Sequence, residues 1–262
     1  MPQAAVAPKV LSPDEVAAYE RDGFLICRDV FELREIEELA SESEALGKRK
    51  DLMDSNNLRC RWKNHHRTGE CTFECFDPVI DIGAACERTA RDSRITGRVA
   101  DLYGEPAHLF KDKLIFKPAG VEGYNLHQDW ISWPGFPASF VTVLVAIDAA
   151  SEENGCTMAY PGRHRDGFAG ALDGGYHETP PAFVAGVEPV PLCLARGDIA
   201  IFGGFTPHFS HPNRSDAARR QLYLSYNSDS DGGDRRDAHY AEFHAWLRGR
   251  YADFGRKESY FQ

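Results

Sequence analysis

Hydrophobic positions in the first hundred residues recur three or four residues apart, which is the helical period. Ser12, Pro13 and Glu15 match the start of a helix, because a hydroxyl caps the first turn, proline fits the first helical position and glutamate completes a capping box. This helix is expected to end at Gly23. Residues 24–27 then predict a short strand.

Two further helical segments are expected before the chain changes character. In the first, four apolar residues are spaced for one buried stripe: Leu33, Ile36, Leu39 and Leu46. The helical pattern returns over residues 77–104. Between them, residues 51–77 are polar, locally basic and without a clear period, so we expect an irregular loop that contacts substrate or covers a site. A solvated loop is the alternative.

From residue 105 onward the chain contains short apolar runs bounded by glycine, proline and aspartate. The runs cover residues 109–117, 140–147, 155–160, 197–202 and 221–226. Strands at this density, without helices between them, predict an antiparallel double sheet. We therefore expect a mainly β fold with flanking helices, in which the helices of residues 12–104 pack on a β core of about 105–230.

Two segments lie outside these runs. Residues 163–186 are rich in glycine and have little periodicity, so we expect a long insertion near one mouth of the barrel. Residues 234–254 carry aromatic side chains at helical spacing and predict an amphipathic C-terminal helix. Because there is no internal repeat or low-complexity linker, we expect one domain over residues 1–262.

Composition narrows the classes of function. The net charge of −10 disfavours a nucleic-acid partner, which needs a basic surface. No run approaches the roughly 18 apolar residues that span a bilayer, and residues 1–8 lack the basic and apolar regions of a signal peptide. Seven cysteines, an odd number without an export signal, favour reduced thiols. We expect a cytoplasmic protein that acts on a small molecule.

Candidate chemistry centres on His127 and Asp129. One residue separates them, so both side chains leave an extended segment on the same side. His208 is the candidate for a third ligand, and His211 competes with it. Two histidines and a carboxylate on one face of an octahedron, with the opposite face open, are typical of non-haem Fe(II) oxygenases.

Arg219 follows His208 by eleven residues and precedes an alternating apolar run. A guanidinium at this offset could hold the distal carboxylate of a 2-oxo acid through two parallel hydrogen bonds. Ser210 shares a face with His208 if the run is extended, and could donate another hydrogen bond. Arg220 should point away, but a one-residue bulge would exchange the two arginines. We therefore expect 2-oxoglutarate as the cosubstrate.

Taken together, the stretches 123–130, 154–164 and 197–220 resemble the phytanoyl-CoA dioxygenase family, and the resemblance covers roughly residues 10 to 230 in order. It implies a double-stranded β-helix core, of the jelly-roll or cupin-like type, and an enzyme that uses Fe(II), 2-oxoglutarate and O2. It also implies the roles of the site residues: metal ligands His127, Asp129 and His208, the carboxylate clamp Arg219, and cosubstrate contacts Gln128, Ser210 and one of Lys111 and Lys113.

The resemblance bears on the reaction as well. Halogenating relatives replace the carboxylate ligand with a small residue, whereas this chain keeps Asp129. We therefore expect hydroxylation, or a related oxidation such as desaturation or ring closure, rather than halogenation. The alternatives are a cupin-like protein that holds a metal without turnover and a zinc or manganese cupin isomerase.

The substrate is expected to be a small polar metabolite, as in natural-product biosynthesis, because residues 51–77 bring basic side chains to an acidic protein. Trp130, Arg61 and Trp62 are the candidates for substrate contact. For Trp130, packing inside the barrel is the alternative.

Overall fold

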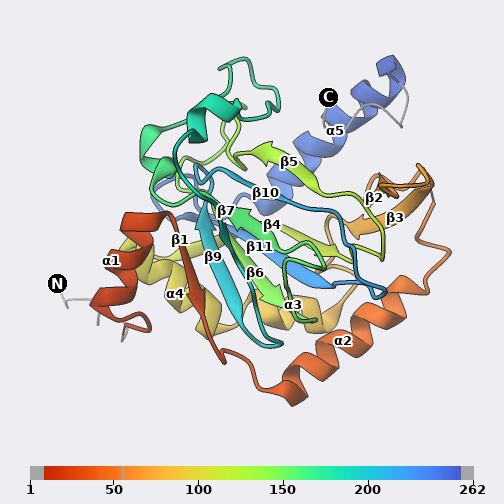
Figure 1. The fold of residues 1–262 in the computed structure, drawn as a ribbon, viewed down its shortest axis with the longest axis horizontal. Helices are drawn as coiled ribbons and strands as arrows, with labels where there is room; N and C mark the ends of the chain where they lie inside the picture. Colours follow the sequence, from red (N-terminus) through yellow and green to blue (C-terminus); the bar gives the residue numbers. More distant parts are fainter. Residues whose placement is uncertain (1–8, 55, 255–262) are drawn as a thin grey trace.

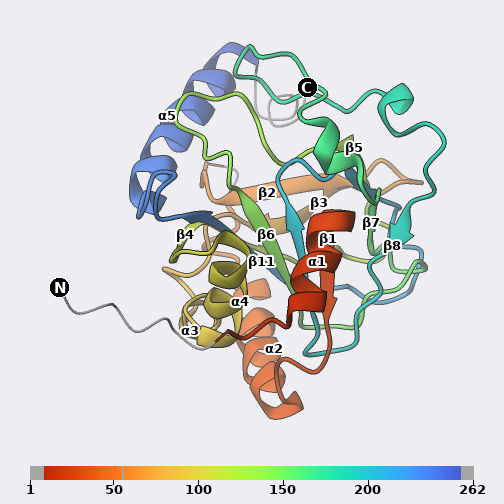
Figure 2. The same cartoon turned by 90° about the vertical axis from the view of Figure 1, so that its left-hand side faces the viewer.

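The computed structural model describes residues 9–54 and 56–254, so the expectation about residues 1–8 lies outside the described residues. All described strand pairs are antiparallel and form two sheets. The N-terminal helices lie on one face of the larger sheet and the smaller sheet lies on the other (Figures 1 and 2). The expected antiparallel double sheet is confirmed.

The strand order places elements distant in sequence side by side. The larger sheet has the order β1 (Phe24–Cys27), β9 (Ile199–Gly203), β6 (Val141–Ala146), β11 (Gln221–Ser228), β4 (Ala107–Ile115), β3 (Cys71–Phe76) and β2 (Cys60–Asn64). The smaller sheet has the order β5 (Tyr124–His127), β10 (His208–Ser210), β7 (Thr157–Ala159) and β8 (Val190–Pro191).

Strand β6 shows how the two cores arise. Successive side chains of a strand point to opposite faces of the sheet. Val143 and Val145 therefore join the core shared with the helices, while Leu144 and Ala146 join the core between the two sheets. Because both faces are buried, β6 reads as a continuous apolar run rather than an alternating one.

The first helix, α1 (Pro13–Asp22), forms as predicted. The hydroxyl of Ser12 accepts a hydrogen bond from the N–H of Glu15, whose carboxylate accepts one from the N–H of Ser12 at 2.8 Å. Gly23 ends the helix with φ of 83°, a left-handed conformation that suits glycine.

In α2 (Leu33–Gly47), the expected stripe is correct except for its first residue. Ile36, Leu39 and Leu46 are buried, but Leu33 is 60% exposed. At 3.6 residues per turn, Leu33 lies about 100° around the helix from the centre of the stripe that the other three form.

The continuous helical segment expected over 77–104 was wrong, because the chain is broken into α3 (Ala84–Ala90) and α4 (Ser93–Tyr103). Pro78 follows a cis peptide bond and belongs to a turn. Asp92 separates the helices, and its carboxylate accepts a hydrogen bond from the N–H of Arg94 at 2.8 Å. A side chain that caps a new helix competes with continuation of the previous one.

The irregular loop expected over 51–77 was also wrong for residues 60–64 and 71–76, which form strands. Strands β2 and β3 pair as a hairpin, and β3 pairs with β4, which extends the larger sheet. Cys75 and Phe76 are buried at the base of the hairpin, whereas Cys71 near its tip is exposed. Burial at one end only does not produce a repeating pattern in the sequence.

The insertion contains two short 3-10 helices, η1 (Arg163–Asp166) and η2 (Pro181–Val184), and it runs beside β5, where the N–H of Thr179 donates to the carbonyl of Leu126 at 2.8 Å. The last element is α5 (Arg236–Phe254), close to the predicted 234–254. Within the two described ranges, no helix combines the length and the apolar sequence that crossing a bilayer requires.

Candidate metal centre and active site

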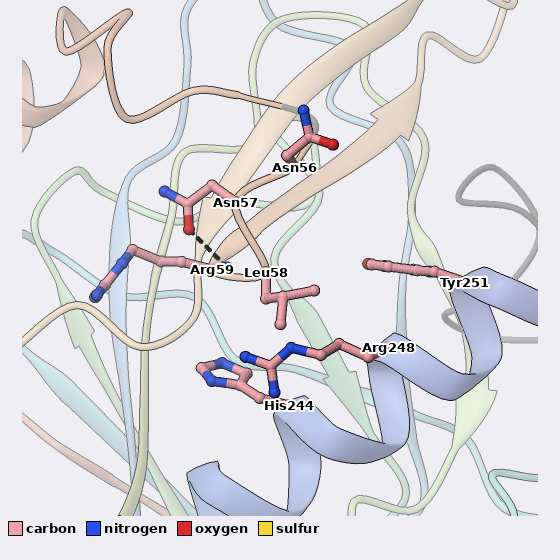
Figure 3. A pocket seen from close by; sticks show the side chains of 7 residues that line it. All are labelled: Asn56, Asn57, Leu58, Arg59, His244, Arg248 and Tyr251. Atoms are coloured by element: carbon pink, nitrogen blue, oxygen red, sulfur yellow. Dashed lines mark hydrogen bonds between the residues drawn. The ribbon is translucent and has the colours of Figure 1, made fainter.

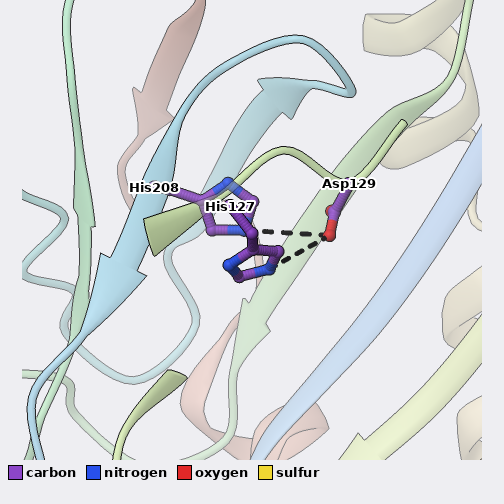
Figure 4. Close-up of side chains that lie close together, drawn as sticks. All are labelled: His127, Asp129 and His208. Carbon is purple, nitrogen blue, oxygen red and sulfur yellow. Dashed lines mark ion pairs between the residues drawn. The ribbon is translucent and has the colours of Figure 1, made fainter. Parts of the chain in front are cut away.

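His127, Asp129 and His208 meet at one end of the smaller sheet. His127 is the last residue of β5, His208 is the first of β10, and the two are direct partners in the register. Oδ1 of Asp129 lies 3.7 Å from Nε2 of His127 and 3.8 Å from Nε2 of His208 (Figure 4). One ligand atom from each residue lies within 4.8 Å of the other two. The structure therefore brings the three predicted residues together.

Backbone carbonyls orient both imidazoles. Nδ1 of His127 lies 2.7 Å from the carbonyl oxygen of Asn125, and Nδ1 of His208 lies 2.9 Å from that of Thr206. A carbonyl only accepts, so each Nδ1 carries the proton and each Nε2 lone pair faces Asp129. Burial, followed by the charge of His127, lowers the pKa of His208 to about 4, so this imidazole is neutral at pH 7.

Thr142 of β6 orients the carboxylate. Its hydroxyl donates to Oδ2 of Asp129 at 2.9 Å, which leaves Oδ1 facing the imidazoles. Burial alone would raise the pKa of Asp129, but the two neighbouring histidines and the charge of Lys113 outweigh burial and hold this pKa below its usual range. The carboxylate is therefore ionised.

This set of donors fits iron(II). Two imidazole nitrogens with free lone pairs and one ionised carboxylate oxygen are a suitable ligand set for that ion, and three positions of an octahedron would remain open. Hydrogen bonds to the far side of each ligand, here from two carbonyls and Thr142, are a usual feature of metal sites.

The candidate metal centre lies where two compartments of one chamber meet. Both compartments are lined by Lys113, Tyr124, His127 and Asp129. The strand compartment encloses about 400 Å³ of empty space, including its open side, and is completed by Ile115, Thr157, His208, Phe209, Ser210 and Tyr223. The aromatic compartment encloses about 880 Å³ on the same measure and is completed mainly by Trp133, Phe136, Phe140, Tyr176, His239, Phe243 and Trp246, with Lys111.

Arg219 is buried just before β11. Its Nη1 donates to the carbonyl of Gly155 at 2.8 Å, while its Nε is buried with no hydrogen-bond partner among the described residues. A buried N–H of a charged group that lacks an acceptor is costly, so this atom indicates a missing acceptor such as a carboxylate.

Lys117 lies beside Arg219 and was not anticipated from the sequence. Its Nζ lies within hydrogen-bond distance of three oxygens: the carbonyls of Gly155 and His211, at 2.8 and 2.7 Å, and the hydroxyl of Ser210, at 3.0 Å. Burial, followed by the charge of Arg219, lowers the pKa of Lys117 to about 6. Lys117 therefore fixes the position of the Ser210 hydroxyl and of the carbonyl that Arg219 contacts.

The geometry distinguishes the residues that the sequence left as alternatives. Arg220 forms an ion pair with Asp148 at 2.8 Å and contacts the carbonyl of Ala40, on the other side of the chain from Arg219. His211 is exposed and its ring packs against Phe209, so it is not part of the candidate metal centre.

Two residues predicted to contact ligands have other partners. The amide nitrogen of Gln128 donates to the carbonyls of Gly167 and Phe205 at 2.8 and 2.7 Å, and its oxygen accepts from the N–H of Ala169 at 2.8 Å. This amide therefore holds the insertion and is not free to donate to a cosubstrate. Trp130 lines neither compartment, because its ring packs against Phe168 and Phe205, so the packing alternative describes it correctly.

The two substrate candidates from the basic segment also lie outside the chamber lining. Arg61 is buried beneath it, where its guanidinium lies 3.6 Å from Asp77 and 5.5 Å from the ring centre of Phe243. Trp62 is 41% exposed on β2 and packs edge-on against Phe73. Neither side chain lines the chamber, because β2 pairs into the sheet, and direct substrate contact by Arg61 and Trp62 stays a prediction.

The two lysines of β4 differ in their surroundings. Lys113 lines both compartments; its ammonium lies 5.6 Å from the ring centre of Tyr223 and makes no hydrogen bond or ion pair with a side chain of the described ranges. Lys111 lines the aromatic compartment but not the strand compartment, and its ammonium lies 3.3 Å from Asp77.

Sequence reasoning missed further residues at the site. Thr142 is the one polar residue within the apolar run 140–147, and that interruption was a usable signal. Tyr124 donates from its hydroxyl to Oε2 of the buried Glu74 at 2.7 Å, and burial raises the pKa of Glu74. For Glu74 and Lys117 the sequence offers no signal, since both are charged residues whose burial depends on strand pairing.

A separate hollow lies between α5 and the segment before β2 (Figure 3). It is lined by Asn56, Asn57, Leu58, Arg59, His244, Arg248 and Tyr251. It shares no residue with the chamber and includes no carboxylate, and Arg59 is paired with Asp81 at 2.6 Å. We therefore place the candidate active site in the chamber.

The chain is similar in sequence to proteins of known families. The family profile described as phytanoyl-CoA dioxygenase matches residues 19–221. The chain is 37% identical over 169 residues to a methylphosphonate hydroxylase of Gimesia maris, covering 63% of this chain and 62% of the relative. It is 36% identical over 183 residues to a 2-aminoethylphosphonate dioxygenase of an uncultured bacterium, covering 68% of this chain and 69% of the relative. The alignment with the first relative thus spans less than two thirds of its length.

The fold has a solved counterpart. EctD from S. alaskensis, crystallised with 2-oxoglutarate and 5-hydroxyectoine, superposes with a TM-score of 0.72 at 20% identity, covering 86% of this chain and 79% of EctD. At this identity the likeness concerns the fold, and the expected jelly-roll core is confirmed. Because the family profile covers most of the sequence, the chain belongs to the phytanoyl-CoA dioxygenase family.

Proposed function

We propose that this protein is an Fe(II)- and 2-oxoglutarate-dependent dioxygenase that hydroxylates a small polar metabolite. The observation that carries the proposal is the convergence of His127, Asp129 and His208 within one chamber. In this proposal the three residues are the metal ligands. Bound iron(II) would supply the activation of dioxygen, with 2-oxoglutarate as the co-reductant that is decarboxylated to succinate.

Arg219 is proposed to hold the distal carboxylate of 2-oxoglutarate. Its buried Nε lacks an acceptor, and a carboxylate would provide one through a charge-assisted hydrogen bond. Ser210, held by Lys117, would contact the same group from β10. Lys113 is the better candidate of the two lysines for a cosubstrate contact, because it lines both compartments and lacks a carboxylate partner among the described residues.

Gln128 is proposed as a positioning residue. Its amide joins the segment after β5 to Gly167 and Ala169 of the insertion, so it fixes one wall of the aromatic compartment, which it also lines. Asp129 supplies the carboxylate ligand, which leaves no vacant protein ligand position for a halide. Hydroxylation, desaturation or ring closure are therefore proposed over halogenation.

The substrate class to test first is the small organophosphonates, because two relatives are named for methylphosphonate and 2-aminoethylphosphonate. A role in natural-product biosynthesis and a cytoplasmic location are part of the same proposal. A small molecule is favoured over nucleic acid because the net charge is −10. The relatives are named as a hydroxylase and dioxygenases, which favours turnover over the non-catalytic cupin-like and zinc or manganese isomerase alternatives.

The proposal is tested by succinate release from 2-oxoglutarate in air with Fe(II), using a panel of small phosphonates and carboxylates. Stimulated release that requires Fe(II) and oxygen is the expected result. Metal binding without any consumption of 2-oxoglutarate would instead identify a non-catalytic protein, and turnover of a substrate without 2-oxoglutarate would identify an isomerase.

A further inference from the structure

Helix α5 forms part of the wall of the aromatic compartment, although it lies beyond residue 221, where the family match ends. Phe243 and Trp246 pack against each other with ring centres 6.1 Å apart, and Trp133 from the segment before β6 packs against Trp246 at 5.7 Å. This wall offers a broad aromatic surface to an apolar group.

A buried cluster of charged residues lies behind this wall. Asp77 is 3.3 Å from the ammonium of Lys111 and 3.6 Å from the guanidinium of Arg61, and Asp112 is 2.7 Å from that of Arg236. Burial alone would raise the pKa of Asp77, but Lys111 and Arg61 outweigh it and keep this pKa below its usual range. Arg236 also pairs with the exposed Asp237 at 3.4 Å, so three cations face three carboxylates. Lys111 is the member of the cluster that lines the chamber, so a positive charge reaches the chamber there.

His239 of α5 and Lys111 both contact the ring of Phe243 and both line the aromatic compartment. The ammonium of Lys111 is 4.3 Å from that ring centre, and the imidazole of His239 is stacked on the ring at 5.7 Å. His239 is 9% exposed, and its Nε2 is buried with no hydrogen-bond partner among the described residues. Burial, followed by the charge of Lys111, lowers its pKa to about 3, so the ring is neutral and can donate one hydrogen bond.

We propose that Lys111 and His239 form a subsite for an oxyanion, a phosphonate or carboxylate, on a substrate whose apolar body lies against Phe243 and Trp246. This inference rests on the proposed function and narrows its substrate class. The ammonium supplies charge, the imidazole supplies an N–H, and the aromatic wall buries the rest of the molecule.

The same surroundings disfavour a substrate that carries an ammonium group. Among the residues that line the two compartments, Asp129 is the sole carboxylate, and it already faces the imidazoles of the candidate metal centre. The ammonium groups of Lys111 and Lys113 would repel an ammonium group on the substrate. The structure therefore separates this chain from its relative named for 2-aminoethylphosphonate.

The first experiment measures binding of four probes to the full, metal-free chain by titration calorimetry. The oxyanion probes are 2-phenylethylphosphonate and 3-phenylpropionate. The probe that binds more tightly shows whether the subsite prefers a phosphonate or a carboxylate. The comparison probes are 2-phenylethanol, which lacks the charge, and 2-aminoethylphosphonate, which replaces the ring with an ammonium. We expect each comparison probe to bind at least about tenfold more weakly than the better oxyanion, because each loses charge-assisted hydrogen bonds or aromatic burial.

Variants then test the individual residues against the better oxyanion probe. Lys111→Met should weaken binding about tenfold or more, His239→Phe should weaken it several-fold, and Lys111→Arg should restore most of the affinity of Lys111→Met. Trp246→Ala should weaken the phenyl-bearing probe and leave methylphosphonate unaffected. Trp62→Ala is the matched control, because Trp62 is exposed outside the chamber. Thermal melts identify any variant that does not fold.

Two results would overturn the inference. One is binding of 2-phenylethanol or 2-aminoethylphosphonate as tight as that of both oxyanion probes, which is measured on the unmodified chain and needs no variant. The other is a loss of affinity in Trp246→Ala no larger than in Trp62→Ala. Because these measurements need no metal and no turnover, they are independent of the proposed function, which is overturned by an absence of 2-oxoglutarate consumption with Fe(II).

Discussion

The strand compartment takes its side chains from strands whose hydrogen-bonded register fixes them, whereas the aromatic compartment takes much of its wall from α5 and the segments between strands. Apart from Tyr223, the residues that line the first lie within 19–221, which the family profile covers, and α5 lies beyond them. We infer that the part of the sequence that the family profile covers carries the oxidative chemistry and that α5 helps to select the substrate. Changes in the two compartments should therefore differ in kind: loss of turnover in the first, altered substrate preference in the second.

The largest effect is expected from Asp129→Gly. Removing the carboxylate ligand should lower hydroxylation by about a thousandfold or more, since several kcal/mol of metal-dependent stabilisation are lost. Binding of 2-oxoglutarate should persist in part, because Arg219 is untouched. Succinate release and calorimetric titration measure the two quantities, with the exposed Asp216→Gly as control. Full activity would remove Asp129 from the ligand set.

Next in size is Arg219→Ala. Loss of a charge-assisted pair should raise the KM for 2-oxoglutarate about 10- to 100-fold, with a smaller change in kcat. Arg220→Ala is the natural control, because the guanidinium of Arg220 is paired with Asp148. This variant should leave the KM for 2-oxoglutarate unchanged. If the two variants exchanged behaviour, the clamp would be Arg220.

Thr142→Val tests the orientation of the carboxylate without altering its charge. The variant keeps the side-chain shape but removes the hydrogen bond to Asp129, and loss of such a contact behind a ligand weakens metal binding about 10- to 100-fold. Titration with Fe(II) under anaerobic conditions measures the change. Thr68→Val, an exposed threonine in the turn after β2, should bind the metal as the unmodified chain does. Equal affinity in both variants would show that Thr142 does not orient the ligand.

The smallest effect concerns pH and Lys117. Its folded pKa is about 6, below the ordinary value of 10.5, so between these values the unfolded chain binds more protons than the folded one. The contribution of Lys117 to the free energy of unfolding therefore rises with pH across this window. Lys117→Met should flatten that rise, which denaturant titrations at pH 6.5 and 9 would detect. An unchanged slope would mean that Lys117 titrates normally.

Features that depend on neighbouring residues could be predicted from the sequence, whereas features that depend on distant residues could not. The capping box at Ser12 and the convergence of His127 and Asp129, which one residue separates, are set by neighbouring residues, and the structure places both as expected. The hairpin of β2 and β3 depends on pairing with β4, which residues 51–77 do not encode on their own.

The residues that line the chamber could likewise not be predicted from the sequence alone. Trp130 and Ile131 are adjacent in sequence, yet Ile131 lines the aromatic compartment and Trp130 packs against Phe168. Phe243 and Trp246 read as the buried face of an amphipathic helix, and only docking of α5 shows that they also face the chamber. Substrate contacts of this kind come from tertiary packing.

The hydroxyl of Thr142 belongs to the larger sheet, while His127 and His208 belong to the smaller one. A cation bound by these imidazoles and by Asp129 would connect the two sheets. Metal binding would then stabilise the fold as well as enable chemistry, and the melting temperature of the protein should rise with the concentration of free metal.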